Sequence, residues 1–269
     1  MNNVLEIRTM QSSVIKTLVE ALKELLTDVV LEADETGLRV IAMNKACAVL
    51  VHLRLDADRF EFFRCDKPLN LGVNIINLHK LIKTVGKDDT LTLYVEGDES
   101  YLGIKIESTE KNSKTVYKLN LLDMENTKIS VSPMQFDDMI VLGSSEFQKL
   151  CRDMHNIADV VEIKVVNGEV MFSCKGDFSC QETVLGNGCL QKVDAPEPGE
   201  EQHQPPPPDG TDITQGMFNL DYLVMFTRCT NLSPTVQLYL KNDFPLFVRY
   251  TVSNLGEIKL VCAPQTATV

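Results

Sequence analysis

The chain has 269 residues, 44% of them apolar, which is enough to bury the core of one large domain or of two ordinary ones. Its formal charge of −12 argues against a uniformly basic nucleic-acid binder but is compatible with cations gathered on one surface. No stretch approaches the roughly 20 apolar residues of a membrane span, and the N-terminal residues lack a signal-peptide pattern, so an intracellular protein is expected.

The reactive residue types form no recognisable site. The eight cysteines include no CxxC pair and most have apolar neighbours, which favours buried reduced thiols over disulfides or metal ligands. The four histidines lack paired metal-ligand spacing, and no phosphate-binding loop or nucleophile motif appears. We therefore expect no metal site, no cofactor and no catalytic residues, and an enzyme is the least favoured class.

Short strands and amphipathic helices alternate along the first half of the chain. Apolar residues recur every three or four positions in two segments, which predicts helices over 12–26 and 75–85. The second helix is expected to bury Ile76, Leu78, Leu81 and Ile82. Short runs rich in Val, Leu and Ile, or alternating with period two, predict strands over 28–34, 37–43, 47–54, 90–95 and 102–106, with a hairpin turn at 97–100.

The second half shows the same pattern. Helices are predicted over 145–156 and 220–229, and strands over 160–166, 169–174, 235–240 and 246–252. Each amphipathic helix should lie with one face on a sheet and the other face free. The expected fold class is α+β, with two similar domains that each combine antiparallel sheets with two helices.

Two irregular stretches interrupt these elements. The segment 121–133 is polar and too long for a turn, so it is interpreted as an interdomain connector. The predicted organisation is an N-terminal domain over 1–120, a connecting loop over 121–135 and a C-terminal domain over 136–269. The segment 193–212 contains four consecutive prolines and several acids and is interpreted as an extended surface loop, with a proline-recognition ligand as a less favoured alternative.

The chain repeats against itself. At an offset of 145, Leu78, Leu81 and Lys83 fall on Leu223, Phe226 and Arg228, and the strand 90–94 falls on 235–239. Earlier in each half, the start of the first helix and a glycine turn recur at offsets of 132 and 131. A self-match spaced by half the chain indicates one supersecondary unit used twice.

The free faces of the helices carry cations. Three helices have a pair of cations spaced by seven or three, which places both on one face, and the fourth helix has Asp221 and Arg228. One such helix would be interpreted as an ordinary solvated surface. Four in a net-acidic protein favour a shared surface that contacts phosphate without reading bases. The faces lack interleaved aromatics, so duplex backbone is favoured over single strands.

Several motifs in order carry a family resemblance. They comprise Phe63-Arg64-Cys65-Asp66, Leu71-Gly72-Val73-Asn74 and Lys80-Leu81-Ile82-Lys83, together with 18–23, 146–147, 151–153 and the terminal Ala263-Pro264. From about Val4 to Pro264 the chain resembles the sliding clamps of the proliferating cell nuclear antigen family. The proline-rich loop is unusual and suggests a divergent, viral lineage.

The resemblance implies a DNA polymerase processivity factor. Three identical subunits would close into a ring with helices lining a central hole and sheets outside, and duplex DNA would pass through it. It also implies a clamp loader, clamp-binding peptides on polymerase and repair proteins, no catalytic activity, no membrane association, and a place in the nucleus or a viral replication compartment. The alternatives are a monomeric DNA-binding processivity factor and a subunit of a heteromeric checkpoint clamp.

The resemblance also assigns residues. The DNA-binding positions that it implies are Lys16, Lys23, Arg64, Lys80, Lys83, Lys149, Arg152 and Arg228. The partner-peptide pocket that it implies comprises Met43, Ala48, Leu50, Ile129, Val131, Pro133, Phe136, Phe244, Pro245, Phe247, Val261, Ala263 and Pro264. Ring closure would use the edge strands 114–120 and 178–185.

The chain departs from the family pattern at several positions. Asp221 stands where a cation is frequent, so the fourth helix should hold DNA more weakly. Cys47 stands where the family often has a histidine. Asn167 stands in place of the lysine that accepts ubiquitin.

Overall fold

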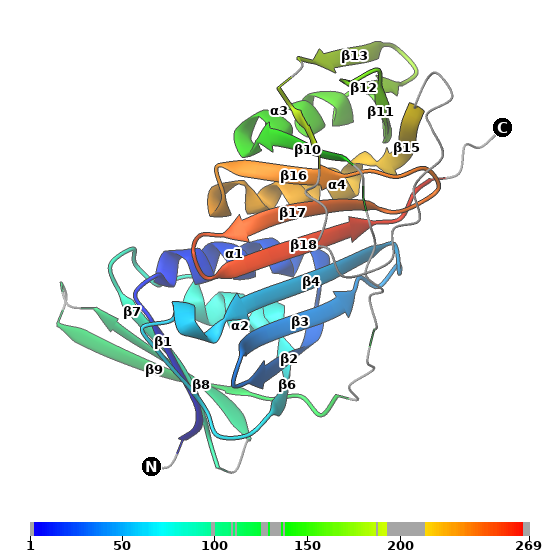
Figure 1. Cartoon of the computed structure of the whole chain (residues 1–269). Helices are drawn as coiled ribbons and strands as arrows, with labels where there is room; N and C mark the ends of the chain where they lie inside the picture. Colours follow the sequence, from blue (N-terminus) through cyan, green and yellow to red (C-terminus); the bar gives the residue numbers. More distant parts are fainter. Residues whose placement is uncertain are drawn as a thin grey trace. The chain divides into compact units, whose positions relative to one another are not determined.

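The computed structural model describes residues 3–97, 100–108, 110, 112–124, 129, 136, 138–186, 188–192 and 213–265 (Figure 1). The chain divides into two compact units. The first comprises Met1–Val131, Arg228–Pro234 and Arg249–Leu260, and the second comprises Ser132–Thr227, Thr235–Val248 and Val261–Val269. In its described residues each unit contains antiparallel strands and two α-helices, which confirms the predicted α+β class.

The strands of the first unit are β1 (Asn3–Thr9), β2 (Asp28–Asp34), β3 (Gly37–Met43), β4 (Val49–Asp56), β5 (Phe62–Cys65), β6 (Leu69–Asn74), β7 (Thr90–Glu96), β8 (Tyr101–Ser108) and β9 (Ser113–Asn120). Five of them form an antiparallel sheet in the order β5-β1-β7-β8-β9. The other four pair in the order β4-β3-β2-β6. A short 3-10 helix, Ala57–Arg59, follows β4.

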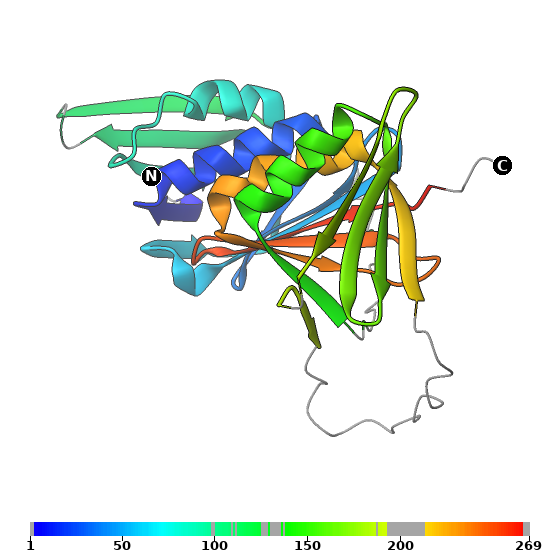
Figure 2. The ribbon, with the colours of Figure 1, turned by 90° about the horizontal axis from the view of Figure 1, so that it is seen from above.

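The helices of the first unit are α1 (Ser12–Leu25) and α2 (Ile75–Ile82), and they lie side by side (Figure 2). Residues on α2 are buried at Ile75, Leu78 and Ile82, a spacing that keeps them on one stripe. The prediction that Ile76 is buried is wrong, because it follows Ile75 by about 100° around the helix and is 40% exposed. Leu81 is half-buried for the same reason.

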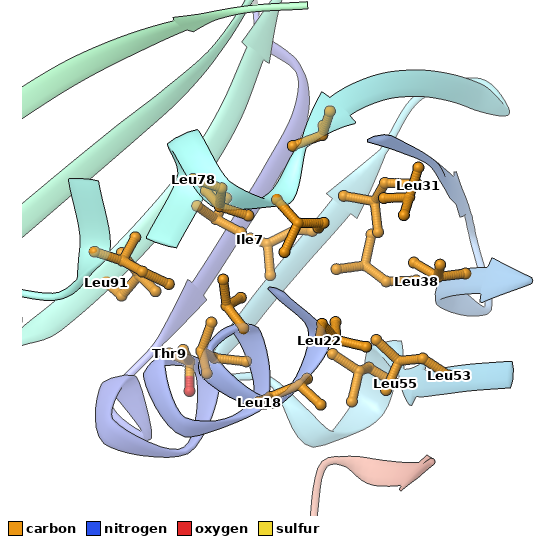
Figure 3. Close-up of a pocket in the computed structure, with 18 of the residues that line it drawn as sticks. Ile7, Thr9, Leu18, Leu22, Leu31, Leu38, Leu53, Leu55, Leu78 and Leu91 are labelled. Atoms are coloured by element: carbon orange, nitrogen blue, oxygen red, sulfur yellow. The ribbon is translucent and has the colours of Figure 1, made fainter. Parts of the chain in front are cut away.

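The core of the first unit contains an apolar cavity of about 70 Å³ between the helices and the strands (Figure 3). Leu18 and Leu22 of α1, Leu78 of α2 and Leu53 and Leu55 of β4 are among its lining residues. An apolar lining offers water few hydrogen-bond partners, so a cavity of this kind stays dry. The cavity is part of the hydrophobic core, whose side chains hold the two helices against the strands.

The second unit contains β10 (Asp138–Gly143), β11 (Val160–Val166), β12 (Glu169–Lys175), β13 (Cys180–Leu185), β14 (Leu190–Lys192), β15 (Ile213–Asn219) and β16 (Thr235–Tyr239). One antiparallel sheet has the order β13-β12-β11-β15, and β10 pairs with β14 and β16. Its helices, α3 (Ser144–His155) and α4 (Leu220–Phe226), contact each other. Two further strands, β17 (Leu246–Val252) and β18 (Gly256–Cys262), contribute residues to both units.

The internal repeat has a structural counterpart. Asn74 caps α2 by accepting a hydrogen bond from the backbone N–H of Asn77, and Asn219, 145 residues later, caps α4 by accepting from that of Asp221. The first helices also match: buried Ser12 opens α1 and buried Ser144, 132 residues later, opens α3. Equivalent helices of the two units therefore begin at the same residue type, at positions related by the offset of the repeat.

The end of the fourth predicted helix differs from expectation. The α-helical part ends at Phe226, and a 3-10 helix spans Thr227–Leu232. Buried apolar side chains recur every third residue there, at Leu220, Leu223, Phe226, Cys229 and Leu232. A period of three matches the three residues per turn of a 3-10 helix, so the 220–229 helix was predicted three residues too long.

Some sequence predictions fall outside the described residues. They concern the proline-rich segment 193–212, most of the connector 121–135 and the middle of the 97–100 turn.

Candidate nucleic-acid interface

The first unit carries four of the predicted DNA-binding cations on its two helices. Lys80 and Lys83 are exposed on α2 and at its C-cap. Lys23 forms an ion pair with Glu24 at 2.9 Å. Lys16 donates a hydrogen bond to the carbonyl oxygen of Val85 at 3.2 Å, which connects α1 to the segment after α2. Lys16 therefore contacts the backbone of another segment. Lys80 is exposed and donates to Asn77 Oδ1 of its own helix at 3.3 Å, and Lys83 is exposed.

His79 lies among these charges and was not singled out from the sequence. Burial lowers the pKa of His79, Lys23 and Lys83 lower it further, and Glu20 opposes them. These effects mean that side chains of α1 and α2 share one electrostatic environment around the imidazole. The only sequence signal was its place between Leu78 and Lys80 on a helix with cations.

The second unit carries Lys149 and Arg152, both exposed on α3. Gln148 of the same helix donates to the carbonyl oxygen of Thr227 at 3.1 Å, the counterpart of the Lys16 contact in the first unit. At the end of α3, His155 Nε2 lies 2.8 Å from Asp221 Oδ1 on α4. Sequence reasoning identified Asp221 as unusual but missed this partner, because the two residues are 66 positions apart.

The structure does not bring Arg64 and Arg228 onto these helices. Arg64 lies on β5, where its guanidinium forms an ion pair with Asp66 at 2.8 Å and donates to the carbonyl oxygen of Asn3 at 3.0 Å. Asp66 also raises the pKa of Arg64, which remains charged. Arg228 is exposed on the 3-10 helix after α4, in a segment that groups with the first unit.

The predicted peptide pocket is represented in both units. In the first, exposed Met43 of β3 pairs in register with half-buried Leu50 of β4. The turn between them is held by Asn44, whose side-chain oxygen accepts from the N–H groups of Ala48 and Val49. Cys47 adopts a left-handed conformation there, with φ of 54°.

In the second unit the pocket residues include an aromatic cluster. The ring of Phe136 lies 5.1 Å from that of Phe247, edge to face, and 5.4 Å from that of Tyr239. Phe244 is exposed, with the Lys241 ammonium 5.2 Å from its ring centroid.

The remaining pocket positions differ in exposure. Pro245 is half-buried, Val261 is buried, and Ala263 and Pro264 are exposed. Ile129 is half-buried, whereas Val131 and Pro133 lie outside the described residues. An exposed aromatic and adjacent prolines are the chemistry that receives an apolar peptide anchor.

Each unit also has an edge strand with exposed apolar side chains. β9 is the last strand of the five-stranded sheet, and its Val116 is 46% exposed. β13 is the last strand of the four-stranded sheet, with Val184 50% exposed and Phe178, just before it, 78% exposed. Edge strands with unpaired backbone groups and apolar side chains are suited to pairing with another chain.

Three observations concern metal binding, thiol reactivity and membrane insertion. Within them, no group of three or more His, Cys, Asp and Glu side chains is arranged to hold a metal ion. None of the eight cysteines forms a disulfide, but only four of them are buried, so the expectation of buried thiols is wrong for Cys47 and Cys180, which are exposed. Burial raises the pKa of the Cys229 thiol to about 12, which makes it a poor nucleophile. None of the described helices is long and apolar enough to cross a membrane.

Comparison with known proteins gives two family matches and a close relative. The model described as "Proliferating cell nuclear antigen, N-terminal domain" matches residues 4–128, and the model described as "Proliferating cell nuclear antigen, C-terminal domain" matches residues 130–265. The chain is 35% identical over 268 residues to "Probable DNA polymerase sliding clamp 1" of Paramecium bursaria Chlorella virus 1, covering 98% of this chain and 97% of that protein. With both domain models in order along nearly its whole length, the chain belongs to the proliferating cell nuclear antigen family.

Proposed function

We propose that this DNA sliding clamp works as a ring of three identical chains that encircles duplex DNA and keeps a polymerase on its template. Encirclement would prevent dissociation, while weak electrostatic contacts would permit sliding. The chain would supply no catalytic activity and need no cofactor. A clamp loader would open the ring, and the site of action would be the nucleus or a viral replication compartment.

The observation that carries this proposal is the repeated pair of helices with exposed cations in an acidic protein. Lys80 and Lys83 on one pair and Lys149 and Arg152 on the other are exposed, although the net charge is −12. An overall acidic protein would repel DNA unless its cations were concentrated where DNA passes. Lysine and arginine contact phosphates at any sequence, which suits a clamp that slides.

The two edge strands support ring closure. Pairing β9 of one copy with β13 of the next would satisfy both rows of unpaired backbone groups and cover Val116 and Val184. Such a contact is heterologous, joining two different surfaces, so it closes into a ring when the rotation between copies fits. Three copies of the two-unit chain would supply six such units.

The peptide pocket would receive segments of polymerase, nucleases and other clamp-binding proteins. Exposed Phe244 of the second unit provides apolar contact area. The Phe136–Phe247 packing supports a role for this region as a rigid aromatic wall. Rigid aromatic surfaces suit the capture of a short helical turn with apolar anchors.

Molar mass in solution tests the ring. Three copies of the 30.1 kDa chain would give about 90 kDa by light scattering. Replacing Val116 and Val184 with glutamate should produce a folded monomer, since both side chains are half exposed in the single chain. Met10→Glu, at a 64% exposed position outside both edge strands, is the matched control and should leave the trimer intact. A monomeric wild-type chain would contradict the ring and favour the monomeric processivity factor. A requirement for a second kind of chain would favour the heteromeric clamp.

Removal of the helix cations tests the DNA-facing surface. Changing Lys80, Lys83, Lys149 and Arg152 to alanine should reduce polymerase stimulation on primed circular DNA and lower the salt dependence of duplex binding. The matched control removes four cations from strands, Arg39, Arg54, Lys164 and Lys175. An equal loss in both variants would mean that only net charge matters and would contradict the assignment.

A further inference from the structure

The five-stranded sheet of the first unit packs one face on the core and carries polar and aromatic side chains on the other. Leu5, Leu91 and Leu102 are on the core side and are buried. The strand register places Tyr94 on the opposite side, between Glu6 of β1 and Gly103 of β8, and we call this side the Tyr94 face. Side chains stand perpendicular to a sheet, so pairing through the backbone at the β9 edge would leave this face uncovered.

The ring of Tyr94 lies flat on the sheet. A Cβ atom added to Gly103 would lie 2.2 Å from Cζ, 2.4 Å from Cε1 and 2.5 Å from Cε2 of Tyr94, so one face of the ring covers the glycine. Tyr94 is nevertheless only half-buried, because the other face of its ring is open to solvent. Single-stranded bases stack on aromatic rings that lie on a sheet in this way.

Two pairs of a cation and an aromatic ring flank Tyr94. On the β9 side, the ammonium of Lys118 lies 4.0 Å from the centroid of the Tyr101 ring and donates to the Tyr101 hydroxyl at 2.8 Å. On the β5 side, the guanidinium of Arg8 lies 5.5 Å from the centroid of the Phe62 ring, which is 37% exposed. The Tyr94 face therefore alternates aromatic rings with cations, the combination that binds single strands.

The Tyr94 face is slightly positive. Its charged side chains on the five strands are Arg8, Arg64, Lys105, Lys114 and Lys118 against Glu6, Glu96 and Glu107. Glu107 is paired with Lys105 at 2.8 Å, and Asp66, just beyond β5, is paired with Arg64 at 2.8 Å. Even with Asp66 included, cations outnumber acids here, although the whole chain has a formal charge of −12. This local excess is complementary to a phosphate backbone.

A buried hydroxyl lies between two of these cations. Thr92 is directly opposite Arg8 on one side and Lys105 on the other, and it is 2% exposed. Within the described part of the chain, Thr92 Oγ1 has no hydrogen-bond partner. A buried hydroxyl without a partner is unfavourable. A phosphate oxygen held by the flanking cations would supply the missing acceptor.

The second unit has a matching tyrosine with a different neighbour. The offset of 145 aligns Tyr94 with Tyr239 of β16. The ring of Tyr239 lies 5.4 Å from that of Phe136, whereas no aromatic ring of the described residues packs against Tyr94. The chain thus supplies its own ring beside the tyrosine of the second unit and leaves the tyrosine of the first unit open to an external one.

We propose that the Tyr94 face binds single-stranded DNA, with a base stacked on Tyr94 and phosphates held by cations that include Arg8, Lys105 and Lys118. This activity is separate from the passage of duplex along the helices. The choice of DNA over RNA rests on the proposed function, which places the chain on a template whose single-stranded part adjoins the duplex. Stacking and phosphate contacts are indifferent to base identity, so little sequence preference is expected.

The test is fluorescence anisotropy with a labelled 20-nucleotide oligothymidylate. The parent protein is the full chain without the helix cations, which carries Lys80→Ala, Lys83→Ala, Lys149→Ala and Arg152→Ala. In this parent, Tyr94→Leu still covers Gly103 but has no aromatic face, and it should weaken binding about tenfold. Tyr94→Phe keeps the aromatic face and should bind as the parent does. Lys105→Gln with Lys118→Gln should lower the slope of log affinity against log salt by about 1.4.

Tyrosine fluorescence gives a second readout. The chain contains six tyrosines and no tryptophan, so its emission comes from tyrosine. A base stacked on Tyr94 should quench part of that emission in the parent. Tyr94→Phe should bind the oligonucleotide equally well with less quenching, a result that a purely structural role for Tyr94 would not produce.

Several outcomes would overturn the proposal. Equal affinities of the parent and Tyr94→Leu would show that no base stacks on this ring, and absence of binding by the parent would mean that single strands bind at the helices. A polyglutamate peptide that competes as effectively as oligothymidylate would show an anion site without stacking. Tighter binding of oligouridylate would assign the face to RNA. Duplex binding by the wild-type chain tests the proposed function separately, so the two failures are distinguishable.

Discussion

The second helices of the two units begin alike and end differently. Both follow a strand, and both start at an asparagine cap, at Asn74 and at Asn219. In α2 the burial then follows the 3.6-residue period of an α-helix, whereas after Leu220 every third residue is buried and a 3-10 helix takes over at Thr227. The duplicated sequence thus preserves where the helix starts, while packing decides how it continues.

The polar contacts between paired helices show the same division. Lys16 in the first unit and Gln148 in the second, 132 residues apart, each donate to a backbone carbonyl beyond the second helix. The contact is retained although one donor is charged and the other is not. By contrast, the position of Lys23 in the first unit is occupied by His155 in the second, and the position of Lys80 by Met225. The scaffold contacts recur in both units, and the charges on the free face have diverged.

The largest expected difference between the units concerns equivalent core positions. Phe226 is fully buried, whereas Leu81, its equivalent at an offset of 145, is half-buried. Phe226→Ala should therefore lower the free energy of unfolding by about 3–5 kcal/mol and Leu81→Ala by about 1 kcal/mol. Urea unfolding at fixed protein concentration measures both.

Ile82 provides the control for helix α2. It is 1% exposed, so Ile82→Ala should cost about 2–5 kcal/mol, well above the neighbouring Leu81→Ala. Equal losses of stability in Leu81→Ala and Ile82→Ala would contradict the finding that Ile82, and not Leu81, lies in the buried stripe of α2.

The helix caps should show an intermediate effect. Asn74→Ala and Asn219→Ala each remove one cap acceptor and should each lower stability by about 1 kcal/mol, with serine largely restoring it. Aspartate should separate the units, because Asn74 Nδ2 also donates to Asp28 at 2.6 Å. A second carboxylate there would repel Asp28, so Asn74→Asp should be less stable than Asn74→Ser in the same unfolding measurement. An Asn74→Asp variant as stable as Asn74→Ser would show that the Asp28 contact is unimportant.

The sequence was sufficient to predict the four helices and the duplication, because apolar periodicity and a repeated offset are local or linear signals. It did not predict that Ile76 faces solvent, since a short helix rich in isoleucine and leucine has several possible buried stripes and packing selects one. Apolar residues at every third position from Leu220 to Leu232 were visible in the sequence, but five such positions are also compatible with a longer α-helix.

The candidate site shows a sharper limit. Lysines at spacings of three and seven could be assigned to free faces from helical geometry alone. Helical geometry alone could not show whether a lysine on such a face is available to bind a ligand. Lys16, for example, donates to a backbone carbonyl 69 residues away in the chain. The partner of Asp221 is equally distant in sequence. Contacts between elements depend on the tertiary arrangement, which periodicity does not contain.

The smallest expected effect concerns the histidine that the first unit carries on its second helix. Burial and the nearby Lys23 disfavour the charged form of His79, so its pKa should lie below the ordinary value of 6.5. An NMR titration that follows an imidazole proton of His79 in the protein without DNA would measure this pKa. Lys23→Met should raise the pKa by removing a neighbouring positive charge. Val224 occupies the equivalent position in the second unit, so that unit has no titratable side chain there. A His79 that titrates at or above 6.5 would mean that Glu20 and Glu24 outweigh the lysines, and that the face of the first unit is less positive than its lysines suggest.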